Sequence, residues 1–301
     1  MSRRVNRELR VEFSESGLTS YAGLELMIRY LRRIDLNGLI RQHLTGLAGD
    51  FGVTAMVRVV RGLLIVGGRR LQHVGHLVGD PLLHRFCGLA QLPGRFTLSR
   101  WLQQCTGRWI GRLGGLNAAV VARTILMLPW LRTLTIDVDG TVLSTGRTVE
   151  RAFRGFNPHH RKVPSYYPIT AHLAETGHLL RVKNRSGNIN DGKASITFLR
   201  ELVAQVADTL GRAFRLRFRM DGDFFKETVL RLLIARGAGY AIKVPFWQWL
   251  DLQQRIREWR KWRRVTGDVS CFEGCLSLRP WQLELHVVIY RKVVHHRSAK
   301  N

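Results

Sequence analysis

The first 130 residues carry apolar side chains at the three- and four-residue spacing of amphipathic helices. One such run starts at Leu24, a second covers residues 36–40, and a third extends from Thr54 to Val66, where Gly67 begins a break. We therefore expect a helical N-terminal region over residues 1–130.

A short basic helix is expected after the turn residues Pro93 and Gly94, with Thr97 as its N-cap. This helix would carry Arg100 and Trp101. Helix-turn-helix proteins use a turn followed by such a helix to present side chains to a DNA groove. The same pattern also fits one more surface helix of a bundle. Residues 1–130 are thus a candidate DNA-binding domain, and Arg100 is a candidate contact.

After Pro129 the apolar period changes to two. The segment TLTIDVDGTVL alternates apolar and polar side chains, which predicts a β-strand with one unusually acidic face. Further strands are expected over residues 178–188, 214–222 and 239–244, and helices over residues 194–210 and 227–235. This order of elements indicates a mixed α/β core over residues 131–245, and an α+β fold for the whole chain.

The residue pattern changes again over residues 246–301, where tryptophan and arginine become frequent. We expect a helix over residues 247–264, in which Trp259 and Trp262 stand among basic residues, followed by short strands. Such a helix could hold a DNA end, with arginine on phosphate and tryptophan on a base. Equally, the arginine stems could pack along the indoles. A strand pattern is still running where the sequence ends.

The net charge of the chain limits the classes of function that fit it. The 301 residues include 48 Lys and Arg against 22 Asp and Glu, a net charge of +26. Such a field attracts polyanions, of which nucleic acid is the commonest, and argues against an enzyme for small neutral substrates. The most apolar stretch, residues 116–134, is broken by two arginines and Pro129, and the N-terminus lacks the apolar core of a signal peptide. We expect a soluble protein with no membrane partner.

Two aspartates at strand ends are the strongest candidates for chemistry. Asp139 precedes Gly140 at the end of one predicted strand, and Asp221 ends another. Carboxylates at the ends of neighbouring strands repel each other, so a divalent cation often offsets their charge. Mg²⁺ binds one or two carboxylates together with phosphate oxygens, and it assists cleavage of phosphodiesters. The alternative is turn chemistry, since Asp-Gly favours turns. Asp137 shares the strand face of Asp139, so the local pattern does not say which of the two is a ligand.

Several basic and imidazole side chains are further candidates for DNA contact: Arg100, Arg154, His159, His160, Arg161, Lys162, Arg257, Arg260 and Arg263. The run from His159 to Lys162 could clamp a phosphate. A solvated basic hairpin is an equally good interpretation of that run.

Three segments resemble the DDE transposases of bacterial insertion sequences, specifically insertion-sequence family 1380. They are IDVDGTVLSTG with the residues up to Asn188, LRFRMDGDFFKETVLRLLIARGAGYAIKV, and the helical GGRRLQHVGHLVGDPLLHRFCGLAQLPGRFTLSRWL. The resemblance implies a ribonuclease-H-like catalytic core in which Asp139 and Asp221 are the first two acids and bind Mg²⁺, with Mn²⁺ as a substitute. It also implies cleavage of double-stranded DNA at terminal inverted repeats, joining to target DNA, a homodimer on DNA, and a place in the bacterial cytoplasm at the nucleoid.

The sequence departs from the family at its third acid. That residue is a glutamate on a late helix, after a mostly β insertion, whereas Glu258, Glu273 and Glu284 lack its surrounding motif. We therefore expect residues 246–301 to be the start of that insertion, and the core over residues 131–245 to be incomplete in a C-terminally truncated copy.

Two further acids, Asp137 and Asp223, are possible additional ligands. A two-carboxylate site would bind metal weakly, so a transposase of this kind would have little or no activity. Two other functions therefore stay open. One is a DNA-binding remnant without catalysis. The other is a metal-dependent nuclease on the same fold, which would cut DNA but not join it.

Overall fold

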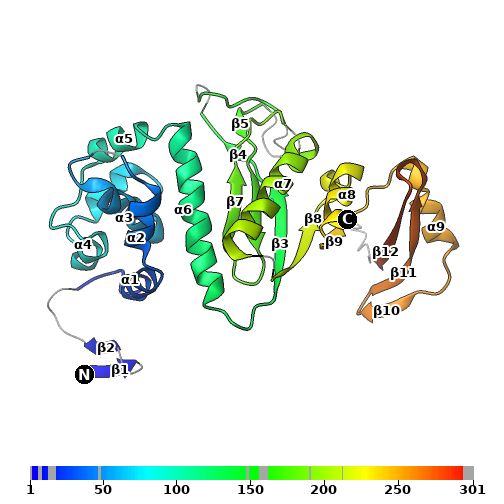
Figure 1. Ribbon diagram of the computed structural model, residues 1–301, viewed down its shortest axis with the longest axis horizontal. Coiled ribbons are helices and arrows are strands. Elements are labelled where there is room, and N and C mark those ends of the chain that lie inside the picture. Colours follow the sequence, from blue (N-terminus) through cyan, green and yellow to red (C-terminus); the bar gives the residue numbers. More distant parts are fainter. Residues whose placement is uncertain are drawn as a thin grey trace, which may run out of the picture. The chain divides into compact units, whose positions relative to one another are not determined.

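The computed structural model describes residues 2–5, 9–12, 18–46, 49–146, 149–155, 162–189, 191–211 and 213–293 (Figure 1). The α-helices are α1 Leu24–Arg33, α2 Leu36–His43, α3 Gly52–Ile65, α4 Pro81–Cys87, α5 Arg95–Gln103, α6 Gly107–Leu126, α7 Asp191–Leu210, α8 Glu227–Ala235 and α9 Leu252–Glu258. Short 3₁₀ turns are η1 Leu71–His76, η2 Gly222–Phe224, η3 Gln248–Leu250 and η4 Arg279–Trp281. The strands are β1 Ser2–Val5, β2 Leu9–Glu12, β3 Thr133–Gly140, β4 Leu143–Ser144, β5 Ser165–Tyr166, β6 Ile169–Leu173, β7 Leu179–Lys183, β8 Arg215–Met220, β9 Gly239–Ile242, β10 Arg263–Thr266, β11 Val269–Leu278 and β12 Leu283–Lys292. The expected combination of helices and strands, an α+β chain, is confirmed.

The chain divides into two compact units. The first comprises residues 1–135, 170–184 and 201–215, and the second comprises residues 136–169, 185–200 and 216–301. Strand β3 and helix α7 contribute residues to both units.

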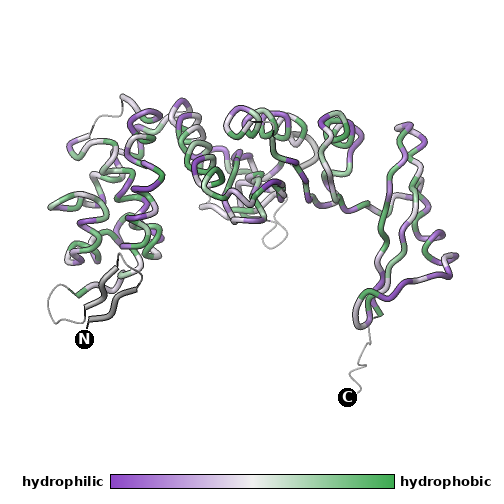
Figure 2. The backbone as a smooth tube through the Cα atoms, turned by 60° about the horizontal axis from the view of Figure 1, so that its bottom comes forward, coloured by the Kyte–Doolittle hydropathy of each residue, from purple (hydrophilic) through white to green (hydrophobic). Residues whose placement is uncertain are grey.

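Helices α1 to α6 of the first unit surround one continuous apolar core. Each is amphipathic, as the mixed hydrophobic and hydrophilic colouring along these segments in Figure 2 shows. Asp80 starts α4 by accepting the backbone N–H groups of Leu82 and Leu83, both at 3.0 Å, which satisfies donors that have no partner within the helix. Residues 1–130 thus contain these six helices, together with strands β1 and β2 near the N-terminus.

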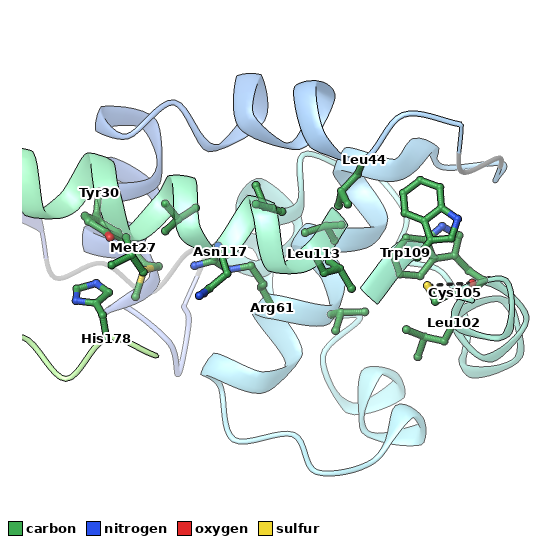
Figure 3. A pocket seen from close by; sticks show the side chains of 16 residues that line it. Met27, Tyr30, Leu44, Arg61, Leu102, Cys105, Trp109, Leu113, Asn117 and His178 are labelled. Atoms are coloured by element: carbon green, nitrogen blue, oxygen red, sulfur yellow. Dashed lines mark hydrogen bonds between the residues drawn. The ribbon is translucent and has the colours of Figure 1, made fainter. Parts of the chain in front are cut away.

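A cavity of about 570 Å³ lies within this first unit (Figure 3). Its wall is mostly apolar, and its polar groups include Arg61, Asn117 and His178. Burial lowers the pKa of both Arg61 and His178, because an apolar wall disfavours their charged forms. Asn117 on α6 donates to the carbonyl oxygen of Leu179 on β7 at 2.7 Å, so it fixes the helix to a strand of the sheet.

The main sheet has the strand order β7-β6-β3-β8-β9. Strands β8 and β9 are parallel, with Arg217 opposite Gly239 and Met220 opposite Ile242. The sheet is mixed, because the amide of Ala174 binds the carbonyl of Thr135 while that of Thr141 binds the carbonyl of Pro168, an antiparallel relation between β6 and β3. Strand β3, the first of these five strands along the chain, lies at the centre of the sheet.

The C-terminal residues form a separate antiparallel sheet of order β10-β11-β12. Strands β11 and β12 pair over their whole length, from Val269 opposite Lys292 to Leu278 opposite Leu283. The predicted strands near the C-terminus are confirmed.

Two predicted helix boundaries are wrong. Helix α5 begins at Arg95 with Gly94 as its N-cap, so Thr97 lies inside the helix instead of capping it. The long helix predicted over residues 247–264 is only α9, because Asp251 before it adopts a left-handed backbone and Trp259 after it is extended. Arg263, expected on that helix, belongs to strand β10.

None of the helices in the described part of the chain has both the length and the apolar composition of a membrane span.

Candidate functional site

Asp139 and Asp221 lie at the carboxyl ends of two neighbouring strands of the main sheet, β3 and β8. Strands β3 and β8 are adjacent, and two contacts define their alignment. The amide of Arg215 donates to the carbonyl of Arg132 at 3.0 Å, and the guanidinium of Arg219 binds the carboxylate of Asp137. These contacts join residues 83 and 82 positions apart, so the strands run parallel. Asp139 and Asp221 are also 82 positions apart, which puts them opposite each other at the same sheet edge.

Both carboxylates stand at the surface and are held by the backbone that follows them. One oxygen of Asp139 accepts the N–H of Gly140 at 2.9 Å. One oxygen of Asp221 accepts the N–H of Asp223 at 3.1 Å and thereby caps η2. Both side chains belong to exposed residues. The turn chemistry considered as an alternative is therefore present, and in each contact it uses one oxygen of the carboxylate.

Asp137 has a different environment from Asp139, although the two share a strand face. Its two oxygens accept from the Nε and Nη2 of Arg219 at 2.5 and 2.6 Å, a bidentate arrangement. Bidentate pairing satisfies both oxygens of a carboxylate and offsets its charge. Asp137 thus forms an ion pair across β3 and β8, two residues before the strand ends that carry Asp139 and Asp221.

A hollow of about 440 Å³ adjoins Asp221. Asp221 and Asp223 line it from one segment, and Lys226, Lys243 and Trp247 line it from the segments that follow. The position of Lys243 follows from the sheet, since its amide donates to the carbonyl of Met220 at 3.2 Å, directly before Asp221. Two cations and two carboxylates therefore surround one solvent-open space.

The sequence reasoning missed Lys226 and Lys243. The available signal was weak: Lys226 follows the Asp-Phe-Phe segment after β8, and Lys243 directly follows β9. Lys226 follows Asp221 by five residues in the chain, whereas only the parallel pairing of β8 with β9 shows that Lys243 lies near both of them.

The predicted DNA contacts come from separate elements. Arg100 is exposed on α5, Arg154 and Lys162 are exposed in loops, and Arg257 is exposed near the end of α9. Arg260 is exposed between α9 and β10. His159, His160 and Arg161 lie outside the described residues.

Arg263 on β10 is exposed and forms an ion pair with Glu273 at 2.9 Å. A hydrogen bond to the Cys271 sulfur, and then the charges of Cys271 and Glu273, raise the pKa of Arg263. Its charge is therefore partly offset by an acid of the chain itself.

Two of the three glutamates considered for a third acid have side-chain partners of their own. Glu258 accepts from the side-chain amide of Gln254 at 2.8 Å, and Glu273 contacts both Arg263 and His286. Glu284 is exposed on β12, opposite Ser277. Within the described part of the chain, no three residues among His, Cys, Asp and Glu gather into a group that could hold a metal ion.

The donor set at the sheet edge is compatible with a hard divalent cation. It consists of two exposed carboxylates, Asp139 and Asp221, with lysines beside the second of them. Mg²⁺ in proteins is often bound by one or two carboxylates and completed by water and substrate phosphate. Asp137 contributes less to such a set, because Arg219 binds both of its oxygens.

The family model described as transposase DDE domain, group 1, matches residues 1–298. No curated protein matches the chain.

Among solved structures, similarity is found to a piggyBac transposase synaptic complex with hairpin DNA, at a TM-score of 0.41 and 11% identity, over 91% of this chain and 62% of that one. A Mos1 transposase paired-end complex with the left transposon end matches at 0.28 and 10% identity, over 71% and 72% of the two chains. A Mos1 mariner paired-end complex with Mn matches at 0.28 and 9% identity, over 82% and 75%.

Proposed function

Because the chain belongs to the transposase DDE domain family, group 1, we propose that it is a DNA transposase that uses Asp139 and Asp221 for phosphoryl transfer on DNA. The proposed reaction is strand cleavage at terminal inverted repeats, followed by transfer of the freed 3′-hydroxyl to target DNA. The single observation that carries this proposal is the juxtaposition of these two carboxylates at one edge of β3 and β8.

The strand order supports a ribonuclease-H-like core for this proposal. In the order β7-β6-β3-β8-β9 the first strand of the core is central, with the second and third on one side and the fourth and fifth on the other. Helices α7 and α8 connect β7 to β8 and β8 to β9. The first acid then ends the central strand, and the second follows the strand beside it.

The residues of this chain divide the work as follows. Asp139 and Asp221 would hold Mg²⁺ or Mn²⁺, and the chemistry that such an ion supplies is polarisation of the phosphate and stabilisation of the leaving oxygen. Lys226 and Lys243 would bind phosphate oxygens in the adjoining hollow. Arg219 neutralises Asp137, so that the local acidic charge is concentrated on the two residues at the strand ends.

Asp223 is assigned no ligand role in this proposal, and the third acid stays without an assigned position. DNA binding would draw on the net charge of +26, and the proposed contacts among the described residues are Arg100, Arg154, Lys162, Arg257, Arg260 and Arg263. A transposase must hold the two ends of its mobile DNA together, which calls for two copies of the chain. We therefore propose a homodimer on DNA.

The test is a cleavage and joining assay with the full chain. Labelled duplexes that span the genomic DNA on both sides of the gene are incubated with the protein in Mg²⁺ or Mn²⁺, and products are separated on denaturing gels. We expect 3′-hydroxyl products and joined strands from the wild-type protein. Asp221→Asn should lower the rate by at least 10³-fold, since one of the two ligands loses its charge.

Asp208→Asn provides the matched control, because Asp208 is an exposed aspartate on α7 and the change in charge is the same. It should leave the rate within about twofold. Cleavage without joining would identify the nuclease instead. DNA binding with a steep salt dependence but no metal-dependent cleavage would overturn the proposal in favour of a DNA-binding remnant.

A further inference from the structure

Four aromatic rings form one cluster in the segments after β8, β9 and β11. Trp247 and Trp249 are stacked, with centroids 5.6 Å apart and planes at 28°. Trp281 meets both of them edge-on, at 6.0 and 5.5 Å. Phe225, which is 1% exposed, contacts Trp247 and Trp281 from the core side and so anchors the cluster.

The outer rings of this cluster are open to solvent. Trp247 is 36% exposed and Trp249 is 45% exposed, and the neighbouring Phe246 is 62% exposed. Exposed apolar groups that gather in one place mark binding surfaces more often than scattered ones do. A second hollow, of about 660 Å³, is lined by Phe246, Trp247, Gln248, Trp249, Pro280 and Trp281.

Trp247 lines both this aromatic hollow and the hollow beside Asp221. Trp247 is therefore shared between a space that contains Lys226 and Lys243 and a space walled by aromatic rings. A nucleotide has the same division, because its phosphate is anionic and its base is a flat apolar ring with polar edges. The ligand must present that base outside a duplex, since a stacked base has no free face for an indole.

We propose that Trp247 and Trp249 form a stacking site for one unpaired nucleobase of DNA, with Lys226 and Lys243 on the adjoining phosphate. The inference rests on the proposed function, and it adds a positioning role: a base held here would place the neighbouring phosphodiester beside Asp221. Base–aromatic stacking is tolerant of sequence, because every base has a π-face. The site would therefore select for an unpaired nucleotide and not for a particular base.

The test measures binding without catalysis. A duplex with a single unpaired 2-aminopurine and a fully paired duplex of the same length are titrated with the full-length protein in EDTA, so no strand is cut. The wild-type protein should quench the fluorescence of the unpaired 2-aminopurine. Trp249→Ala should restore that fluorescence and weaken binding of the bulged duplex by about tenfold, the effect of 1.4 kcal/mol.

Three variants make this outcome specific. Trp249→Phe should keep most of the quenching, because it retains an aromatic face. Trp130→Ala removes an indole that is 65% exposed elsewhere in the chain, and it should change neither probe. Lys243→Gln should weaken the bulged and paired duplexes alike and reduce the dependence of affinity on salt, as expected for a phosphate contact.

Equal losses for the two duplexes in Trp249→Ala, or no loss for either, would overturn the inference. Its failure is distinguishable from failure of the proposed function, since the fluorescence is read without metal. Intact base stacking with no cleavage would reject the transposase and keep the stacking site. Cleavage that requires Asp221, with unaltered binding in Trp249→Ala, would do the reverse.

Discussion

The two regions richest in tryptophan use the same side chain in opposite ways. In the helical first unit, Trp101 and Trp109 are only 6% and 8% exposed and belong to the continuous core. In the second unit, Trp247 and Trp249 are stacked on each other and remain 36% and 45% exposed, and Trp247 lines the hollow beside Asp221. Burial explains the first pair as packing. The exposure of the second pair costs hydrophobic stabilisation, which is understandable where a ligand covers the rings.

The aspartates repeat this contrast. Asp80 in the first unit accepts hydrogen bonds from two backbone amides and from the hydroxyl of Thr19. Both oxygens of its carboxylate are thereby engaged at the start of a helix. Asp221 also caps a turn, but its residue is exposed and it faces a hollow with two lysines. A residue type and a capping role are therefore insufficient to separate structure from function. Exposure and the neighbouring charges separate them.

The contrast is sharpest for thiols, where we expect the largest effect. Cys87 is 1% exposed in the core of the first unit, and burial raises its pKa from 9.0 to about 12. Alkylation proceeds through the thiolate, so the reactive fraction of Cys87 near pH 8 should be about 10³-fold smaller than in the unfolded chain. Cys275 on β11 is exposed. We expect iodoacetamide to label Cys275 first and Cys87 only in denaturant, as read by peptide mass spectrometry.

The same shift has a consequence for stability. The folded chain keeps the proton of Cys87 at pH values where the unfolded chain has lost it, so stability is complete below pH 9 and falls as the pH rises from about 9 towards 12. Cys87→Ala should remove that part of the alkaline decline. Comparable labelling of Cys87 and Cys275 in the native protein would show that the first core is looser than its burial indicates.

Truncating one tryptophan from each region is the second way to test the comparison. Trp101→Ala should lower the free energy of unfolding by about 3–5 kcal/mol, because it leaves a large void in a packed core. Trp249→Ala should cost about 1 kcal/mol or less, since nearly half of that side chain is already in water. Urea unfolding followed by circular dichroism gives both values. Similar losses for the two variants would mean that the exposed rings support the fold, and the stacking site would lose its argument.

The strand ends were the most predictable part of the site. The change of apolar period after Pro129 correctly predicted β3, and it placed Asp139 at its end. A local pattern, however, does not contain the pairing of β3 with β8, from which the juxtaposition with Asp221 follows. The two lysines of the hollow were missed for the same reason, since their proximity depends on the parallel pairing of β8 and β9.

The helix predicted over residues 247–264 failed for a different reason. Helical spacing of apolar and basic residues is present there, but tertiary contacts override it: the ring of Trp259 stacks on Phe272 at 4.4 Å, and Arg263 pairs with Cys271 in a sheet. Both contacts require β11 to lie beside this segment, and the partners are 13 and 8 residues away in sequence, beyond one helical turn. Propensity within one segment has no access to such a partner.

The smallest effect concerns the ion pair beside the strand ends. Arg219 and Asp137 make two short hydrogen bonds, yet their side chains are 57% and 39% exposed, so water and salt screen most of their attraction. A double-mutant cycle with Arg219→Gln and Asp137→Asn should give a coupling energy of about 0.2–1 kcal/mol, and 0.5 M salt should reduce it.

The contribution of this pair to activity should be larger than its contribution to stability, because releasing Asp137 adds a second negative charge next to Asp139. Arg219→Gln should therefore slow cleavage at saturating Mg²⁺, because the released carboxylate repels the DNA phosphate, while changing the unfolding midpoint little. Asp137→Asn in the same chain should restore the rate. A coupling energy well above 1 kcal/mol, with no change in cleavage, would instead make the pair part of the structural framework.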